Sequence, residues 1–246
     1  MPLEQVLGIL GKAITETAAP EALLEIITNT PGLTPAERVS LQSLPHKQLA
    51  PYQDDFLNQE ASMLRWGFSA AWAALARMGF GIPPGPEDAS AQRRFMIRFK
   101  RKCPSQTHST RELAQLFTEH LRDDCSSLLE THPWLLELAE AERLEINVLY
   151  QMDQGAGHAP AHAELESLVA QPIDALFQNK VILAETAFPT FTYPILEIKK
   201  ALLTSPESSF ETVPFNSAPS PQAYALARDG QTLQPVWYKI SPGEST

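Results

Sequence analysis

Cysteine is scarce in this chain: only Cys103 and Cys125 occur among its 246 residues. Two cysteines cannot form the dense disulfide framework of small secreted domains, and their spacing does not match a CxxC motif. No apolar run approaches the roughly 20 residues that a membrane-spanning helix needs. The segment Met1–Gln5 lacks the basic start of a signal peptide. We therefore expect a cytoplasmic protein whose fold depends on a hydrophobic core.

The motifs of common enzymes are also missing. There is no G-x-G-x-x-G segment, no phosphate-binding loop and no serine in a G-x-S-x-G context, so nucleotide and serine-hydrolase chemistry are unsupported. His158, His162 and Glu164 are spaced like metal ligands, but they lie in a Gly/Ala/Pro-rich loop where no helix would hold them on one face. We predict no catalytic residue and no metal site, and keep an independent metalloenzyme built on these three residues as a third hypothesis.

Positive charge is outnumbered, with 19 lysines and arginines against 29 acidic residues and a formal net charge of −10. This excess argues against duplex nucleic acid as the main partner, because phosphate binding needs a basic surface. One predicted helix is an exception, and two interpretations of it stay open: a solvated face with a cationic last turn, or a docking patch for an acidic partner. Its basic residues are Arg93, Arg94, Arg98, Lys100, Arg101 and Lys102.

Helical signals dominate the first 180 residues. Short helices are predicted over 3–18 and 21–28, and Thr34 and Glu37 form a capping-box pattern that opens a third. The strongest periodicity predicts one continuous helix from Tyr52 to Met78. Further helices are predicted over 87–102, from Ser109 or Thr110 onward, and from His132-Pro133 to about Met152. The apolar seam of the long helix consists of Leu57, Ala61, Leu64, Phe68, Ala71, Leu75 and Met78.

The C-terminal part changes to short β-rich runs. A strand is predicted over Lys180–Glu185, a short helix after Tyr193-Pro194, and a hairpin from Ala223–Arg228 and Pro235–Ile240. The fold class is therefore α+β, a helical N-terminal body with a small antiparallel C-terminal sheet. We predict three domains: an N-terminal helical extension over 1–45, a helical body over 46–170 and a sheet domain over 171–246.

The edge of this sheet is a candidate binding site. An exposed strand edge can capture an extended peptide through main-chain hydrogen bonds. Trp237 and Tyr238 are adjacent and must face opposite sides of the strand, so one of them is expected to be available for contact. The alternative is that residues 204–221, with Phe210 and Phe215, fold back over that surface.

Glu145 is the most informative carboxylate. It falls on the same helical stripe as Leu138, Ala141 and Val148, which should face the core. Because burial of an unpaired charge is costly, Glu145 needs a partner there. We predict an internal ion pair or a helix-cap contact, with an arginine as a possible partner, and keep a contact with a partner subunit as the alternative.

Several short motifs from Leu49 to Ile240 together resemble the HvfC/BufC-like family, whose N-terminal region is often labelled a DNA-binding domain. Tyr52-Gln53 before a long amphipathic helix is similar to the family's opening Tyr-Arg helix, with glutamine in place of arginine. The remaining motifs are Pro133-Trp134-Leu135 leading to Arg143-Leu144-Glu145, the segment Tyr193-Pro194-Ile195-Leu196-Glu197-Ile198, and Arg228-Asp229-Gly230.

This resemblance implies a function. Such proteins accompany TIM-barrel multinuclear non-haem iron oxidases that modify cysteines of ribosomally made peptides, as in the methanobactin and 3-thiaglutamate pathways. The barrel holds the iron, and the companion, which is not itself an enzyme and has no cofactor, binds the leader of the precursor peptide. A DNA-binding or regulatory module is the alternative. We assign peptide binding to Leu226, Arg228, Val236, Trp237 and Tyr238, and docking of the oxidase to Trp134, Arg143, Glu145 and Tyr193.

Overall fold

The computed structural model describes residues 8–11, 20–43, 46–81, 90–103, 109–150, 186–204, 219–228, 232 and 234–240. The chain divides into two compact units. Unit 1 consists of Met1–Trp66 and Ile82–His108, and unit 2 of Gly67–Gly81 and Ser109–Thr246. The predicted domain boundary at residue 45 therefore falls inside unit 1, and the one at residue 170 lies outside the described residues.

Unit 1 is helical. It contains α2 (Pro20–Asn29), α3 (Pro35–Gln42), most of α4 (His46–Gly67) and α6 (Ala91–Lys102). The predicted capping box is confirmed: Thr34 Oγ1 accepts from the Glu37 backbone N–H, and the Glu37 carboxylate accepts from the Thr34 N–H at 2.9 Å. These hydrogen bonds lower the pKa of Glu37 to about 2. Arg38 donates to the backbone carbonyls of Thr28, Thr30 and Leu33, and so fastens α3 to the end of α2.

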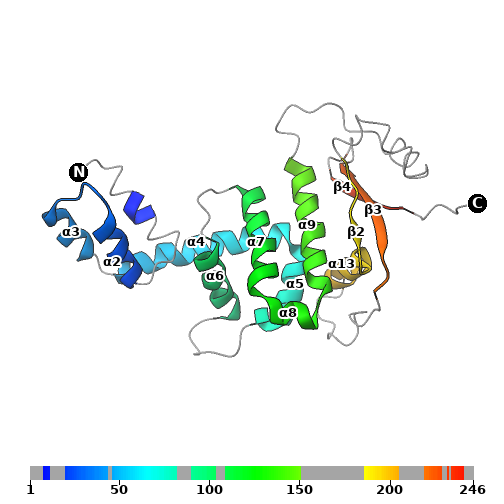
Figure 1. Cartoon of the computed structure of the whole chain (residues 1–246), viewed down its shortest axis with the longest axis horizontal. Coiled ribbons are helices and arrows are strands. Elements are labelled where there is room, and N and C mark those ends of the chain that lie inside the picture. Colours follow the sequence, from blue (N-terminus) through cyan, green and yellow to red (C-terminus); the bar gives the residue numbers. More distant parts are fainter. Residues whose placement is uncertain are drawn as a thin grey trace, which may run out of the picture. The chain divides into compact units, whose positions relative to one another are not determined.

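Unit 2 combines helices with a small sheet (Figure 1). Its helices are α5 (Ser69–Arg77), α7 (Thr110–Asp124), α8 (Ser126–Thr131), α9 (Trp134–Tyr150) and α13 (Ile195–Thr204). Its strands are β1 (Thr186–Ala187), β2 (Thr190–Phe191), β3 (Gln222–Arg228) and β4 (Pro235–Ile240). The α+β prediction, a helical body with a small antiparallel sheet near the C-terminus, is confirmed. The predicted strand over Lys180–Glu185 lies outside the described residues.

The sheet has β3 at its centre. β4 pairs antiparallel with β3 from Ala223↔Ile240 to Arg228↔Pro235. β1 and β2 both pair antiparallel with β3 and are separated by two residues only, so they form one interrupted row along its other edge. The Tyr224 N–H bridges the interruption by donating to the Pro189 carbonyl at 3.0 Å. Four strands thus make three rows, with β4 and the β1–β2 row outside.

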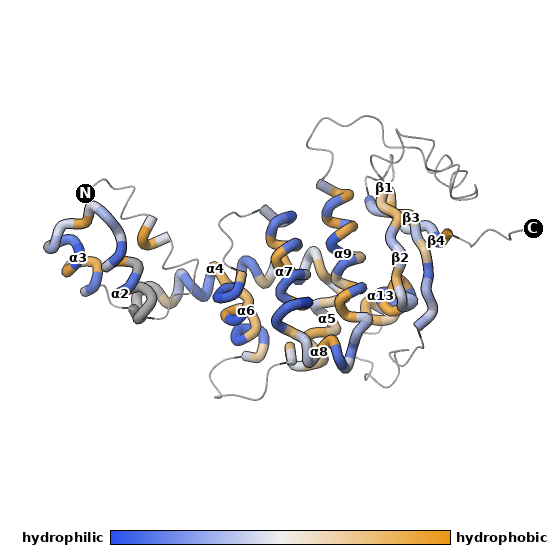
Figure 2. The backbone as a smooth tube through the Cα atoms, in the orientation of Figure 1, coloured by the Kyte–Doolittle hydropathy of each residue, from blue (hydrophilic) through white to orange (hydrophobic). Residues whose placement is uncertain are grey.

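Helix α9 lies at the centre of unit 2. It packs against α7, α5, α13 and the sheet, and Figure 1 shows it between α7 and the strands. Apolar and polar residues alternate along both α7 and α9, which Figure 2 shows as alternating orange and blue. This pattern leaves one apolar face on each helix for burial. The buried residues include Leu113, Phe117, Leu121, Leu135, Leu138, Ala141 and Val148.

The predicted continuous helix over 52–78 is wrong. The structure has two helices instead, α4 and α5, separated at Phe68, whose φ and ψ of −116° and 50° are not helical. Six of the seven predicted seam residues are nevertheless buried, because the apolar spacing continues across the break. Met78 is half-buried. The break coincides with the boundary between the two units at Trp66/Gly67.

None of the helices in the described part of the chain is long and apolar enough to span a bilayer.

A left-handed turn after α5 gives a test of the fold. Gly79 and Gly81 have φ of +59° and +61°, a region that disfavours residues with a Cβ. A methyl group at Gly81 would lie 2.6 Å from Leu128 Cδ1, whereas one at Gly79 would meet no atom within 4 Å. We expect Gly79→Ala to lower the free energy of unfolding by about 1 kcal/mol and Gly81→Ala by about 2–3 kcal/mol. Urea unfolding measures both, and equal effects would contradict the contact with Leu128.

Candidate functional site at helix α9 and strand β4

Glu142 of α9 caps another helix. Its carboxylate accepts from the backbone N–H groups of Ala70 and Ala71, at 2.9 and 3.0 Å, and from the Ser69 hydroxyl at 3.3 Å. These groups form the N-terminus of α5, where the first backbone N–H groups have no partner within the helix. Glu142 is fully buried, and burial raises its pKa although Lys199, 3.7 Å away, acts in the opposite direction. The carboxylate explains why α5 can begin inside the protein at Ser69.

Glu137, also on α9, holds the segment that leads into α13. Its two carboxylate oxygens accept from the Thr192 N–H at 3.0 and 2.9 Å, and one of them accepts from the Tyr193 N–H at 3.0 Å. The turn before α13 is thereby fixed to α9. Tyr193 serves here through its backbone, and its side chain is half-buried.

Glu145 joins α9 to both α13 and β4. Lys199 Nζ on α13 lies 2.7 and 2.5 Å from its two carboxylate oxygens, and the Trp237 indole N–H donates to Oε1 at 2.6 Å. The predicted internal ion pair is confirmed, with a lysine as the partner in place of the suggested arginine. Its side chain retains 17% exposure, so the pair is only partly removed from water.

One face of the sheet packs toward α9. Tyr224, Leu226 and Trp237 lie on this face, and the three aromatic rings of Phe191, Tyr224 and Trp237 have centroids 6.0 Å apart in each pair. Burial, together with the charge of Glu197, raises the pKa of Tyr224 to about 12. This aromatic cluster attaches the sheet to the helical part of unit 2.

The structure separates the five predicted peptide-binding residues into two groups. Leu226 has no exposed surface, Trp237 bonds to Glu145, and Arg228 donates to the Leu149 carbonyl at 3.3 Å. These three side chains face α9 and have internal contacts. Val236 and Tyr238 pair with Ala227 and Ala225 and lie on the opposite face, as the predicted alternation of Trp237 and Tyr238 requires. Both are half-buried.

The sequence predicted a strand edge as the binding site without assigning it to a strand, and the main chain of β4 provides such an edge. In an antiparallel ladder, the N–H and C=O of one residue point to the same neighbour, and those of the next residue point the other way. The Tyr224 N–H points toward the β1–β2 row, so the N–H and C=O groups of Ala223, Ala225 and Ala227 point toward β4. Their partners Val236, Tyr238 and Ile240 therefore point inward, and the N–H and C=O groups of Trp237 and Lys239 point to the outer edge. Among the described residues, no strand other than β3 pairs with β4.

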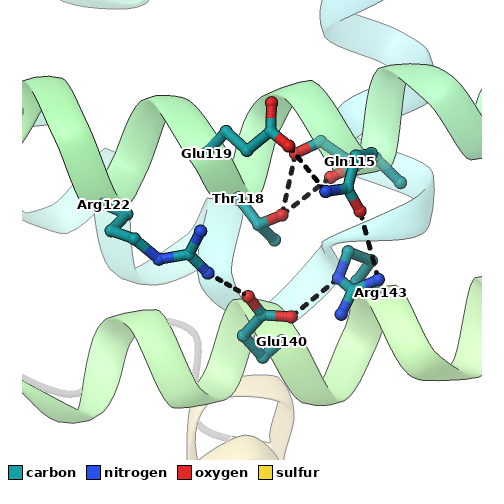
Figure 3. A network of polar contacts seen from close by, with 7 residues as sticks. Gln115, Thr118, Glu119, Arg122, Glu140 and Arg143 are labelled. Atoms are coloured by element: carbon teal, nitrogen blue, oxygen red, sulfur yellow. Dashed lines mark hydrogen bonds and ion pairs between the residues drawn. The ribbon is translucent and has the colours of Figure 1, made fainter.

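The predicted docking residues are largely used inside unit 2. Trp134 is buried at 1% exposure. Arg143 belongs to a polar network between α7 and α9, in which Glu140 accepts from Arg143 Nε and from Arg122 Nη2, each at 2.7 Å (Figure 3). Arg143 also donates to the Gln115 side chain at 3.2 Å. These contacts give Trp134, Arg143 and Glu145 roles in the packing of α9.

The basic helix α6 in unit 1 does not form a uniformly solvated face. Lys100 is fully buried, lies 2.9 Å from the Glu60 carboxylate and stands 5.0 Å from the centre of the Phe56 ring. Arg93 pairs with Asp54 at 2.7 Å. Both open interpretations of this cluster placed Lys100 on the surface, and that placement is corrected: the aliphatic stem is in the core and its charge is neutralised there. Lys100 is therefore not a phosphate-binding residue.

The remaining histidine, cysteine and carboxylate side chains form no metal-binding cluster within the described ranges. No group of three or more His, Cys, Asp or Glu side chains there could hold a metal ion. His158, His162 and Glu164 lie outside those ranges. His120 is buried with Nδ1 3.1 Å from Asp124, Cys103 is half-buried, and Cys125 is buried.

Comparisons of the chain with protein-family models, with curated proteins and with solved structures find no match.

The cap on α5 gives a stability prediction. Glu142→Ala leaves two buried backbone N–H groups without an acceptor, so we expect the free energy of unfolding to fall by about 3 kcal/mol. The control is Glu140→Ala on the same helix, which removes a partly exposed ion-pair network and should cost less than about 1 kcal/mol. Thermal or urea unfolding measures both variants. Similar losses for the two would show that the Glu142 cap is not the stronger constraint.

The same residue gives a pH prediction. Burial raises the pKa of Glu142 in the folded chain, so between the ordinary value of 4.5 and that raised value the folded state binds more protons than the unfolded state. Its contribution to stability is complete below about pH 4.5 and is lost as the pH rises through the folded pKa. Glu142→Gln removes this titration. The stability of the natural chain relative to Glu142→Gln should therefore increase as the pH is lowered from 8 toward 4.5. A difference independent of pH would contradict the raised pKa.

Proposed function

We propose that this chain is a non-catalytic subunit of a multinuclear non-haem iron oxidase complex, and that it binds the leader of a ribosomally made precursor peptide. The oxidase would hold the iron and supply the oxidative chemistry. Members of the family that the chain resembles accompany oxidases that are TIM barrels. The present chain would present a cysteine of the precursor to the oxidase. Carbon excision of the 3-thiaglutamate type and heterocycle formation of the methanobactin type are both compatible with this role.

The arrangement of the resemblance motifs supports the proposal. Residues from motifs that are far apart in the sequence meet on α9. The Tyr193 N–H donates to Glu137, which lies between the Pro-Trp-Leu and Arg-Leu-Glu parts of one motif. Glu145, the last residue of that motif, pairs with Lys199, which directly follows the Tyr-Pro-Ile-Leu-Glu-Ile segment. Arg228 donates to the Leu149 carbonyl. Residues of three of the four motifs therefore contact α9 or belong to it, whereas Tyr52-Gln53 lies in unit 1.

The outer edge of β4 is the observation that carries leader binding. Pro235–Ile240 is a continuous strand, and its outer side presents the main-chain groups of Trp237 and Lys239. The outer edge of the β1–β2 row is less suited to strand addition, because it consists of two-residue pieces interrupted at Phe188-Pro189. A leader strand added to β4 would extend the sheet to a fourth row.

Such a complex would act by positioning. Binding the leader converts the encounter between precursor cysteine and oxidase into an intramolecular event, with an effective concentration set by the chain between leader and cysteine. The side chains on β4 would contribute specificity only where they reach the leader, and the main chain would contribute most of the affinity.

Co-purification tests the proposed function. The chain is expressed with a TIM-barrel iron oxidase of the proposed class and with a short cysteine-containing peptide, both taken from neighbouring genes. We expect a stoichiometric complex that retains the peptide only when this chain is present. If the chain elutes alone and the oxidase retains the peptide without it, the proposed function is wrong.

A substitution on the edge tests strand addition. Lys239→Pro removes an outward N–H and places a ring on the outer edge, but leaves the inward hydrogen bonds of β4 to β3 in place. We expect the dissociation constant of a fluorescently labelled synthetic leader to rise roughly tenfold or more, measured by fluorescence anisotropy. Lys239→Ala is the matched control, because it keeps the N–H and removes only an exposed side chain.

Two results would separate the explanations. Equal weakening by both variants would assign the effect to the lysine charge and contradict main-chain capture. Hydrogen exchange provides a second measurement, in which the segment 235–240 should gain protection when the leader is added to the natural chain.

A further inference from the structure

Among the described residues, β4 is held in the sheet from one side only. On one side β4 pairs with β3, and on the other side its outer edge has no paired strand among the described residues. A strand paired on one side only is held less firmly against twisting than a strand paired on both sides, so side chains that pack against it help to fix its orientation. The direction in which its outward N–H and C=O groups point therefore depends on those side chains.

Trp237 has both an outward-facing main chain and a side chain that is held on the inner face of the sheet. Its main chain points to the outer edge, and its side chain points toward α9, where the ring contacts Phe191 and Tyr224. The indole N–H donates to Glu145 Oε1 at 2.6 Å. Any rotation of β4 about its axis that turns the outer edge also moves the indole, and is resisted by this hydrogen bond.

Glu145 is itself well fixed. Lys199 lies within 2.7 Å of both carboxylate oxygens, so two elements, α9 and α13, determine where the acceptor for Trp237 stands. Hydrogen bonds to an ionised carboxylate are shorter and stronger than neutral ones. The bond length of 2.6 Å agrees with such a charge-assisted contact.

We infer that Glu145 is a positioning residue for peptide capture, which holds the outward main chain of β4 in the orientation that accepts an added strand through its bond to the Trp237 indole. The inference rests on the proposed function and assigns to Glu145 a role different from docking the oxidase. The residue acts through Trp237 and does not itself touch the leader.

The test uses the full chain and the labelled synthetic leader of the nearest cysteine-containing precursor. Trp237→Phe keeps an aromatic ring against Phe191 and Tyr224 but removes the indole N–H. We expect the dissociation constant to rise about tenfold, the effect of losing one hydrogen bond to a charged group. Tyr224→Phe is the control, since it removes a buried hydroxyl from the same aromatic cluster, where Tyr224 donates to Gln222, and leaves the bond to Glu145 intact.

Variants of Glu145 provide a second measurement. Glu145→Gln keeps an acceptor oxygen for the indole and should bind the leader more tightly than Glu145→Ala. The double variant Glu145→Ala with Trp237→Phe should bind no more weakly than the weaker of the two single variants, because both remove the same bond. Strictly additive losses would overturn the inference.

The outcomes distinguish this inference from the proposed function. If the natural chain does not bind the leader, both fail. If the natural chain binds and Lys239→Pro weakens binding, but Trp237→Phe binds as tightly as the natural chain, the edge is the site and the positioning role of Glu145 is wrong. If Tyr224→Phe weakens binding as much as Trp237→Phe, the effect belongs to the aromatic cluster as a whole and the inference is likewise overturned.

Discussion

Three carboxylates on helix α9 hold unit 2 together by accepting hydrogen bonds from the elements around that helix. Glu137 and Glu142 on α9 accept from backbone N–H groups that begin or precede α13 and α5, and Glu145 accepts from Lys199 and Trp237. Buried backbone groups without partners are costly, so Glu142 restricts where α5 can start. The apolar residues of α9 pack against the neighbouring elements, and the carboxylates determine which residues of those elements lie opposite them.

Two opposing effects act on the buried carboxylate of Glu142: the cost of desolvation and the gain from hydrogen bonds and nearby positive charge. Removal of a carboxylate from water is unfavourable, which the direction of its pKa shift reflects. Two backbone N–H groups, the partial positive charge of a helix N-terminus and the nearby Lys199 offset part of that cost. An apolar residue at position 142 would avoid the desolvation but would leave α5 without an acceptor. The buried carboxylate of Glu142 is therefore tied to the start of a specific helix, in contrast to the partly exposed network around Glu140.

Sequence patterns predicted those features that depend on neighbours along the chain. The capping box at Thr34, the helix starts near Ser109 and Pro133, the helix after Pro194 and the hairpin strands all follow from local spacing. The break at Phe68 could not be predicted in this way, because the apolar seam continues through it and the stabilising carboxylate lies more than 70 residues further along the chain. Lys100 presents the same difficulty, since its partner Glu60 lies on another helix.

The candidate site was predictable only in part, for a related physical reason. Sequence reasoning concentrates on side chains, and it assigned peptide binding to residues such as Leu226 and Arg228 whose side chains are used to attach the sheet to α9. The outward groups on β4 belong to the main chain and are the same for every amino acid except proline, so residue identity carries little information about them. The side chains instead specify the contacts that attach the sheet to α9. A motif that ends in Glu145 and a tryptophan that alternates inward are the detectable signs of the contact that attaches β4 to α9.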